Sequence, residues 1–117
     1  MAATYDVHVT GEPPVIVIAL SGQIDREALQ ALTTAYDTVQ TTGPEPVLLD
    51  FGAVDYINST GIALIVGLLG RARADDRPVM ATGLTDHYQR IFAITRLSDF
   101  IAVYPDVDAA LSGTARS

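Results

Sequence analysis

One stretch constrains the fold of this chain more than any other. It is a short apolar run at residues 47–49, with Phe51 just after it, then polar residues, then an apolar segment at 61–74. An unbroken apolar run of this kind is typical of a strand buried on both faces. Residues 58–60, Asn-Ser-Thr, stand directly before the apolar segment, and such side chains accept hydrogen bonds from the unpaired N–H groups at a helix start. The stretch therefore predicts a buried strand, a turn and a helix.

Ser59 has two interpretations at this helix start, and both stay open on the sequence alone. In the first, its hydroxyl caps the helix, which contributes about 1 kcal/mol. In the second, the hydroxyl is a modification site. The N-terminus of a helix carries about half a positive charge, so a phosphate is well tolerated there.

Length and composition predict one soluble domain over residues 1–117, with an ordered core at about 4–112. Hydrophobic residues make up 49% of the chain, which argues against disorder, and no apolar run reaches the length of a membrane span. The chain has no Cys, which excludes disulfides and thiolate metal sites. Its formal charge of −7 disfavours nucleic acid and anionic membranes as partners. We expect a cytoplasmic protein with no metal site and no cofactor.

The remaining segments alternate between strand and helix patterns. The first two strands are separated by a short Gly-Glu-Pro-Pro turn, so we expect them to pair antiparallel. Asp25 is placed to cap the first helix, and Pro78 prevents the second from continuing. This order predicts an α/β domain with a mixed sheet. The expected strands are 5–9, 15–20, 47–51, 79–81 and 100–103, and the expected helices are 26–41, 61–74, 86–94 and 106–111.

The helix at 61–74 carries apolar residues on two sides. At 100° per residue, Leu64 and Leu68 lie nearly opposite the side expected to face the core. They indicate a partner surface, unless a neighbouring helix covers that side too. Gly61 would let another backbone approach closely, whether the chain's own or a partner's. The arginines near the end of this helix are expected to be solvated, and they are Arg71, Arg73 and Arg77. The side expected in the core holds Ile62, Ile65, Val66, Leu69 and Arg73.

The strand ending in Asp50, the turn at 56–61 and the helix after it resemble the STAS family, the sulfate-transporter and anti-sigma-factor-antagonist domains. In that family the turn commonly reads hydrophobic-hydrophobic-Asp-Ser-Ser/Thr-Gly, and here it reads Tyr-Ile-Asn-Ser-Thr-Gly. The resemblance continues through residues 89–97 and 100–105 and ends in 107–111, like the family's final helix. One position departs from the pattern, because Asn58 stands where the phosphorylated antagonists usually have Asp.

The resemblance implies a single STAS-type domain with a mixed sheet of four or five strands, packed by about four helices mainly on one side. It also implies an anti-sigma-factor antagonist, which is a binding module and not an enzyme. Unmodified, such a protein binds an anti-sigma factor that is also a serine kinase, and the sigma factor is freed. Phosphorylation at Ser59, or at Thr60 as second choice, breaks the complex, and a phosphatase resets it. The expected partner contacts are Asp25, Asn58, Ser59, Thr60, Gly61, Leu64 and Leu68.

Several alternatives remain. Asp25 matches a loop that the family uses near its kinase partner, but a capping role explains it equally well. Asn58 lacks the negative charge that a kinase would read, which favours a STAS subunit that is not phosphorylated, in a lipid-transport complex or a stressosome-like particle. Ser59 with a His and an Asp would imitate a hydrolase triad, but no Gly-x-Ser-x-Gly elbow surrounds it. His8 and His87 are isolated and have no metal-site spacing.

Overall fold

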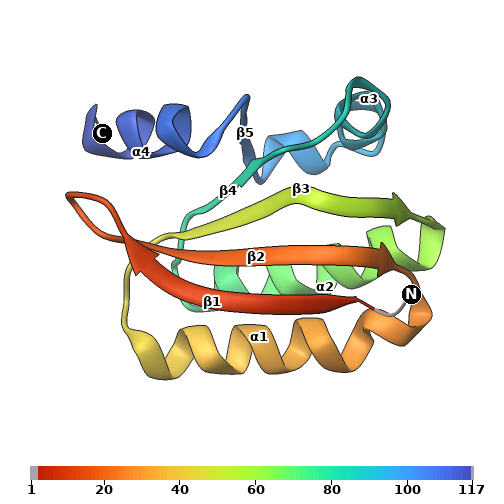
Figure 1. Ribbon diagram of the computed structural model, residues 1–117, viewed down its shortest axis with the longest axis horizontal. Helices are drawn as coiled ribbons and strands as arrows, with labels where there is room; N and C mark the ends of the chain where they lie inside the picture. The colour runs from red at the N-terminus through yellow and green to blue at the C-terminus, as the bar shows by residue number, and fades with distance from the viewer. Residues whose placement is uncertain (1–2, 117) are drawn as a thin grey trace.

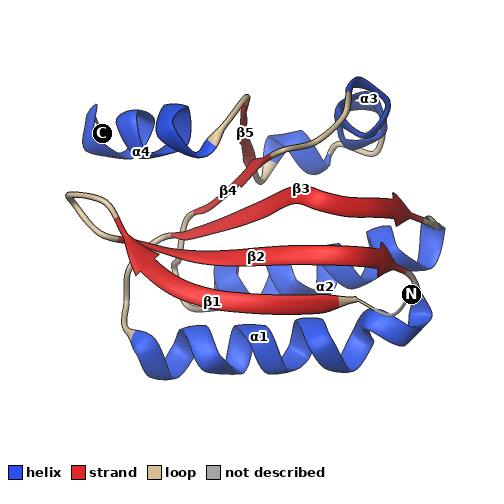
Figure 2. Cartoon of the chain, viewed as in Figure 1, coloured by secondary structure: helices blue, strands red, loops and turns tan. Residues whose placement is uncertain are grey.

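A five-stranded mixed sheet forms the centre of the molecule in the computed structural model, which describes residues 3–116 (Figures 1 and 2). The strands lie in the order in which they occur in the chain. The first pair is antiparallel, as the sequence predicted, and the other three pairs are parallel, which makes the sheet mixed as expected. The strands are β1 (Thr4–Thr10), β2 (Val15–Ile24), β3 (Val47–Ile57), β4 (Val79–Thr82) and β5 (Ala102–Tyr104).

Four helices connect and follow these strands, and two short 3-10 turns precede α1 and β5. Asp25 caps the first turn as predicted, because its carboxylate accepts a hydrogen bond from the Glu27 N–H. Thr85 and Asp106 accept equivalent bonds at the starts of the third and fourth helices. The elements are η1 (Arg26–Ala28), α1 (Leu29–Thr42), α2 (Ser59–Ala74), α3 (Asp86–Ile94), η2 (Leu97–Asp99) and α4 (Val107–Arg116).

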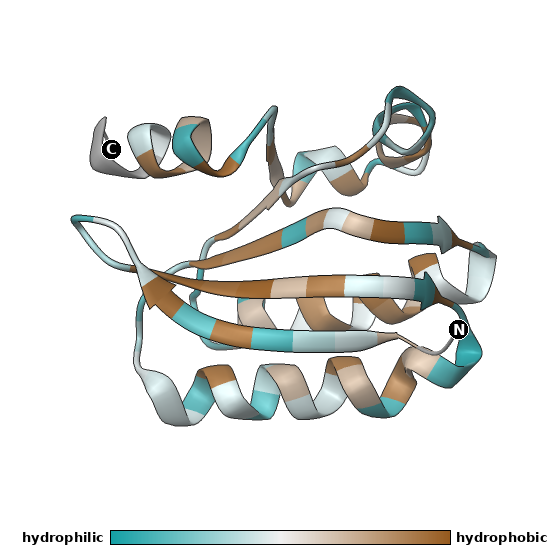
Figure 3. Cartoon of the chain, in the orientation of Figure 1, coloured by the Kyte–Doolittle hydropathy of each residue, from teal (hydrophilic) through white to brown (hydrophobic). Residues whose placement is uncertain are grey.

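Apolar residues fill both faces of the first halves of the central strands β2 and β3, which are largely brown in Figure 3. The larger core lies on one face, where α1, α2 and α3 pack. A smaller core lies on the other face, where Ala110 of α4 packs with Val15, Val17, Leu48 and Met80. Helices thus cover both faces, with three contributing to the larger core and α4 to the smaller one.

Strands β2 and β3 are both longer than the sequence predicted. Their parallel pairing continues past Leu20 and Phe51 until Ile24 lies opposite Ile57. Two register irregularities interrupt it, and Gly22 between them has a positive φ of 85°. The hydropathy pattern missed this extension because the backbone ladder continues where polar and small side chains break the apolar run.

The C-terminal third differs from prediction in three details. Ile91 is half-buried, although we expected it in the core with Phe92. Strand β5 begins at Ala102, because η2 takes up the preceding residues and leaves Phe100 59% exposed. Helix α4 continues to Arg116, beyond the predicted end at residue 111. Within residues 3–116, no helix is both long and apolar enough to cross a membrane.

Candidate functional site

The turn between β3 and α2 presents Ser59 at the surface. Asn58 has extended backbone, and its side-chain oxygen accepts a hydrogen bond of 2.8 Å from the Gly61 N–H. Asn58 is therefore the N-cap, and the expectation that Ser59 caps the helix was wrong. Ser59 is the first helical residue and is exposed, and its hydroxyl has no hydrogen-bond partner among the described residues. With the cap supplied by its neighbour, this hydroxyl is available for other chemistry.

Gly61 fixes the start of α2 against the end of β2. A Cβ atom built on Gly61 would lie 1.9 Å from the carbonyl oxygen of Ile24, which no side chain tolerates. The Asn58 N–H donates to the same carbonyl group at 3.2 Å. The close approach allowed by Gly61 is thus made by the chain's own backbone, and Gly61 is buried. Our expectation of a partner contact at Gly61 is corrected to a role in holding the turn.

Asp25 and the turn at 58–60 lie at the same edge of the sheet. Ile24 pairs with Ile57, so the residues that follow them, Asp25 and Asn58, emerge side by side from parallel strands. Turn η1 packs against α2. The structure therefore brings Asp25 together with Asn58, Ser59 and Thr60, and Thr60 is exposed like Ser59; that these residues contact a partner stays a prediction.

The dipole of α2 favours a negative group at Ser59, whereas the Asp25 carboxylate at the same edge opposes one. Helix α2 has 16 residues, and no acidic side chain occupies its first turn. The partial positive charge of the helix N-terminus therefore faces the Ser59 hydroxyl without a competing carboxylate on the same helix.

Leu64 and Leu68 do not form an exposed face. Leu68 is 4% exposed, and Leu64 is partly buried against the larger core. Both line a small hollow of about 220 Å³ between α1 and α2, together with Leu32 and Tyr36 of α1. The second helix packs against the sheet and against α1, so two of its sides are covered. The expected partner contact at Leu68 was wrong, because α1 covers that side, whereas Leu64 is half-buried and its partner contact stays a prediction.

The exposed side of α2 lies elsewhere and runs directly from Ser59. Ser59, Ala63, Val66 and Gly70 are spaced four, three and four residues apart, so they share one face, and all are exposed. We call these four residues the outer stripe. Val66, which the sequence placed in the core, is 50% exposed. The sequence missed this face because α1 draws the buried side of the helix toward Leu68 and Ala72.

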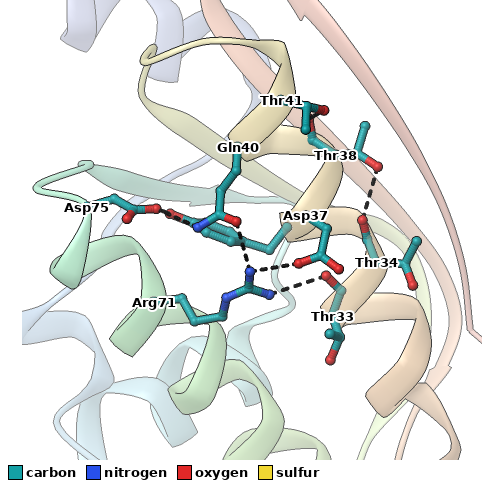
Figure 4. Close-up of polar contacts among 9 residues, drawn as sticks. Thr33, Thr34, Asp37, Thr38, Gln40, Thr41, Arg71 and Asp75 are labelled. Atoms are coloured by element: carbon teal, nitrogen blue, oxygen red, sulfur yellow. Dashed lines mark hydrogen bonds and ion pairs between the residues drawn. The ribbon is translucent and has the colours of Figure 1, made fainter.

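A polar network locks the C-terminal half of α2 to α1 (Figure 4). The Arg71 guanidinium donates to the Asp37 carboxylate at 2.7 Å and to the Gln40 side chain at 3.0 Å, and it lies 4.7 Å from the Tyr36 ring centroid. The Tyr36 hydroxyl donates to Asp75 at 2.8 Å. Arg71 is therefore engaged by α1 and not solvated as expected. Arg77 is not solvated either, because it donates to the Gly43 and Glu45 carbonyl oxygens at 2.8 and 2.6 Å, whereas Arg73 is exposed as expected.

The same network shifts two pKa values. Burial of the Tyr36 ring, followed by the nearby Asp75 carboxylate, raises the pKa of Tyr36 above its ordinary value of 10.0. Hydrogen bonds from Gln40 and then Tyr36 lower the pKa of Asp75. Neither group faces the outer stripe, so we assign the network to stability.

Within the described residues, no group of three or more His, Asp or Glu side chains is placed to hold a metal ion. His8 shares a hydrogen bond of 3.0 Å with Asp6 at the exposed edge of β1. His87 stacks edge-to-face with Tyr88 on α3. Both histidines are thus engaged with side chains of their own elements.

The geometry defines a small α/β domain with a mixed sheet and a hydroxyl displayed at the start of its second helix. A family model described as "Mlab, STAS domain" matches residues 7–104, which is most of the chain. The chain belongs to the STAS domain family.

Named relatives are similar over most of their length. An anti-sigma-B factor antagonist from Listeria monocytogenes is 30% identical over 98 residues, covering 84% of this chain and 85% of that protein. An anti-sigma-B factor antagonist from Staphylococcus aureus is 24% identical over 98 residues, covering 84% of this chain and 91% of that protein. The solved structure of the anti-sigma factor antagonist SpoIIAA in its unphosphorylated form has a TM-score of 0.70 at 14% identity, covering 97% of this chain and 99% of that one. At this level of identity, the similarity to SpoIIAA shows a shared fold only.

Proposed function

We propose that this protein is an anti-sigma-factor antagonist that works as a phosphorylation switch and not as an enzyme. The observation that carries the proposal is that the Ser59 hydroxyl at the N-terminus of α2 is exposed and does not cap the helix. The curated relatives from two bacteria are named anti-sigma-B factor antagonists, which supports the same role. In this proposal the unmodified chain binds a cognate anti-sigma factor and so releases the sigma factor.

The anti-sigma factor is also the kinase. The Ser59 oxygen attacks the γ-phosphorus of ATP, ADP leaves, and a base of the kinase takes the hydroxyl proton. The product carries about 1.5 to 2 added negative charges at one end of the outer stripe. Burying such a charge in an apolar contact is costly, so the partner dissociates. A phosphatase then hydrolyses the phosphate and restores binding.

The test is incubation with the cognate kinase and ATP, followed by peptide mass analysis. We expect one phosphate, located at Ser59, and none on Ser59→Ala. Thr60→Ala is the matched control, because it removes the neighbouring exposed hydroxyl and should still be phosphorylated. Phosphate on Thr60 alone, or undiminished labelling of Ser59→Ala, would contradict the proposal.

A second function is favoured by one residue. Asn58 supplies the cap without a negative charge, so the turn is complete without any feature that a kinase would read. A STAS subunit that docks without phosphorylation, in a lipid-transport complex or a stressosome-like particle, fits this turn. Affinity purification from the native cell separates the two functions, because one predicts a kinase-fold partner and the other a transporter ATPase or other STAS subunits.

A further inference from the structure

A wide cleft lies at the far end of the exposed side of α2. It has a volume of about 740 Å³ and lies between the C-terminal half of α2, the start of β4 and η2. Val66 and Gly70 of the outer stripe form part of its wall. The floor is apolar, with Leu69, Val79 and Leu97. We call it the α2–η2 cleft.

Unpaired apolar surface gathers around this cleft. Val66, Ile94 and Phe100 are 50%, 74% and 59% exposed, and they come from α2, the end of α3 and the residue after η2. A Cβ atom built on Gly70, which lines the cleft, would meet nothing within 4 Å, so the surface of α2 is open beside it. This apolar area extends beyond the cleft along α2, which suits a long segment better than a small molecule.

The charge of the cleft is opposite to that of the whole chain. Three of the seven arginines line it, Arg73, Arg77 and Arg96, against two of the fourteen acidic residues, Asp76 and Asp99. Arg96 pairs with Asp99 at 2.9 Å, and Arg77 donates to the Gly43 and Glu45 carbonyl oxygens at 2.8 and 2.6 Å. The exposed Arg73 guanidinium lies 5.4 Å from the Phe100 ring centroid and is the cation best placed to meet a ligand. In a protein of net charge −7, this local excess of positive charge attracts an acidic segment that most of the surface repels.

We propose that the α2–η2 cleft binds an acidic amphipathic helix of the partner protein, with apolar side chains on its floor and carboxylates toward Arg73 and Arg96. The inference rests on the proposed function in assigning this helix to the anti-sigma factor that contacts Ser59. Arg73 lies fourteen residues after Ser59, about 21 Å along the helix axis. That exceeds the screening length of about 8 Å in physiological salt, so the cleft is a second contact, separate from the phosphorylated end.

The experiment uses a designed probe and the full chain. The probe is a fluorescent peptide of about four helical turns, with Leu at i, i+3, i+4 and i+7 and Glu on its polar face. The comparison peptide has Lys in place of every Glu. By fluorescence anisotropy, we expect the Glu peptide to bind at least about tenfold more tightly than the Lys peptide, with the difference shrinking at high salt. Amide NMR shifts should map to the second half of α2 and to η2.

Variants locate the site. Arg73→Glu and Phe100→Ala should each weaken binding of the Glu peptide by at least about fivefold. Arg90→Glu is the matched charge-reversal control, because Arg90 is exposed on α3 outside the cleft, and should change affinity by less than about twofold. All three side chains are exposed, so the variants should stay folded, with a small loss of thermal stability expected for Arg73→Glu because it reverses a favourable charge in the last turn of α2.

Equal binding of the two peptides, or NMR shifts confined to other surfaces, would overturn the cleft proposal. Peptide binding to Ser59→Ala should equal that of the parent chain. Acidic-peptide binding without any phosphorylation of Ser59 would overturn the switch and leave the cleft standing, so the two failures are distinguishable.

Discussion

Asn58 caps α2, so the Ser59 hydroxyl is not needed as a cap, and the first prediction concerns Asn58. Asn and Asp cap a helix about equally well, so Asn58→Asp should change the melting temperature little. If the kinase reads a negative charge at this position, the substitution should raise the initial rate of phosphate transfer to Ser59. The rate is measured with the cognate kinase and labelled ATP, with Asn58→Ser as a neutral capping control. An unchanged rate in Asn58→Asp would show that residue 58 serves only the turn.

Gly61 gives a second prediction at the same scale. Gly61→Ala places a methyl group against the Ile24 carbonyl, where the distance of 1.9 Å allows no accommodation without backbone movement. We expect a loss of about 2 kcal/mol or more in the free energy of unfolding, measured by urea denaturation. Gly67→Ala is the matched control, because a Cβ there meets nothing within 4 Å. It should be neutral or stabilising, since Ala is the better helix former by about 1 kcal/mol.

Helix α2 itself separates residues that hold the fold from residues that are free to bind. Leu68→Ala removes a buried side chain, so it should cost about 2–5 kcal/mol of stability. Val66→Ala removes a half-exposed side chain of the outer stripe, so it should cost less than about 1 kcal/mol. Thermal unfolding measures the loss of stability in each variant, and binding to the anti-sigma partner is measured on the same samples. If Val66→Ala were the more destabilising, the assignment of the two faces would be reversed.

The pairing of α1 with α2 makes stability depend on alkaline pH. The pKa of Tyr36 is raised in the folded state. The Tyr36 hydroxyl therefore contributes fully to the free energy of unfolding below the pKa of the unfolded state, about 10, and this contribution is lost as pH rises through the pKa of the folded state. Tyr36→Phe should lose about 1 kcal/mol at pH 7, because the hydrogen bond to Asp75 is gone. The difference in the free energy of unfolding between the parent chain and Tyr36→Phe should shrink above pH 10. Urea denaturation across pH 7–11 tests this, with Tyr5→Phe on the edge strand as control.

The sequence predicted the order and type of every main element, because hydrophobic runs, prolines and capping residues are local signals. It also predicted Ser59 at a helix start, since the turn residues 58–60 are contiguous. It could not orient α2, because residues far away in the chain decide which side is covered. Leu68 is buried by α1 and Val66 is not, although both are apolar and two residues apart. The cleft was beyond sequence reasoning for the same reason, because three separate elements form it.

At the scale of the molecule, the two cores lie on opposite faces of the sheet and need not serve the same purpose. The larger core positions α2, and through Gly61 and the Ile24 carbonyl it fixes the turn that carries Ser59. The smaller core holds α4 against β2, β3 and β4 and contains no residue of that turn. Damage to the smaller core should therefore lower stability without altering the geometry around Ser59.

Ala110→Asp tests this separation. Ala110 is fully buried on α4 between the side chains of the smaller core, so a carboxylate there should cost about 3 kcal/mol or more in the free energy of unfolding. Ala93→Asp is the matched control, because Ala93 is exposed in the last turn of α3 and the change there should cost only about 1 kcal/mol, from helix propensity and the helix dipole. At a temperature where circular dichroism shows Ala110→Asp to be folded, its rate of phosphorylation at Ser59 should equal that of the parent chain. A slowed rate in a fully folded sample would mean that α4 and the Ser59 turn are coupled through the sheet.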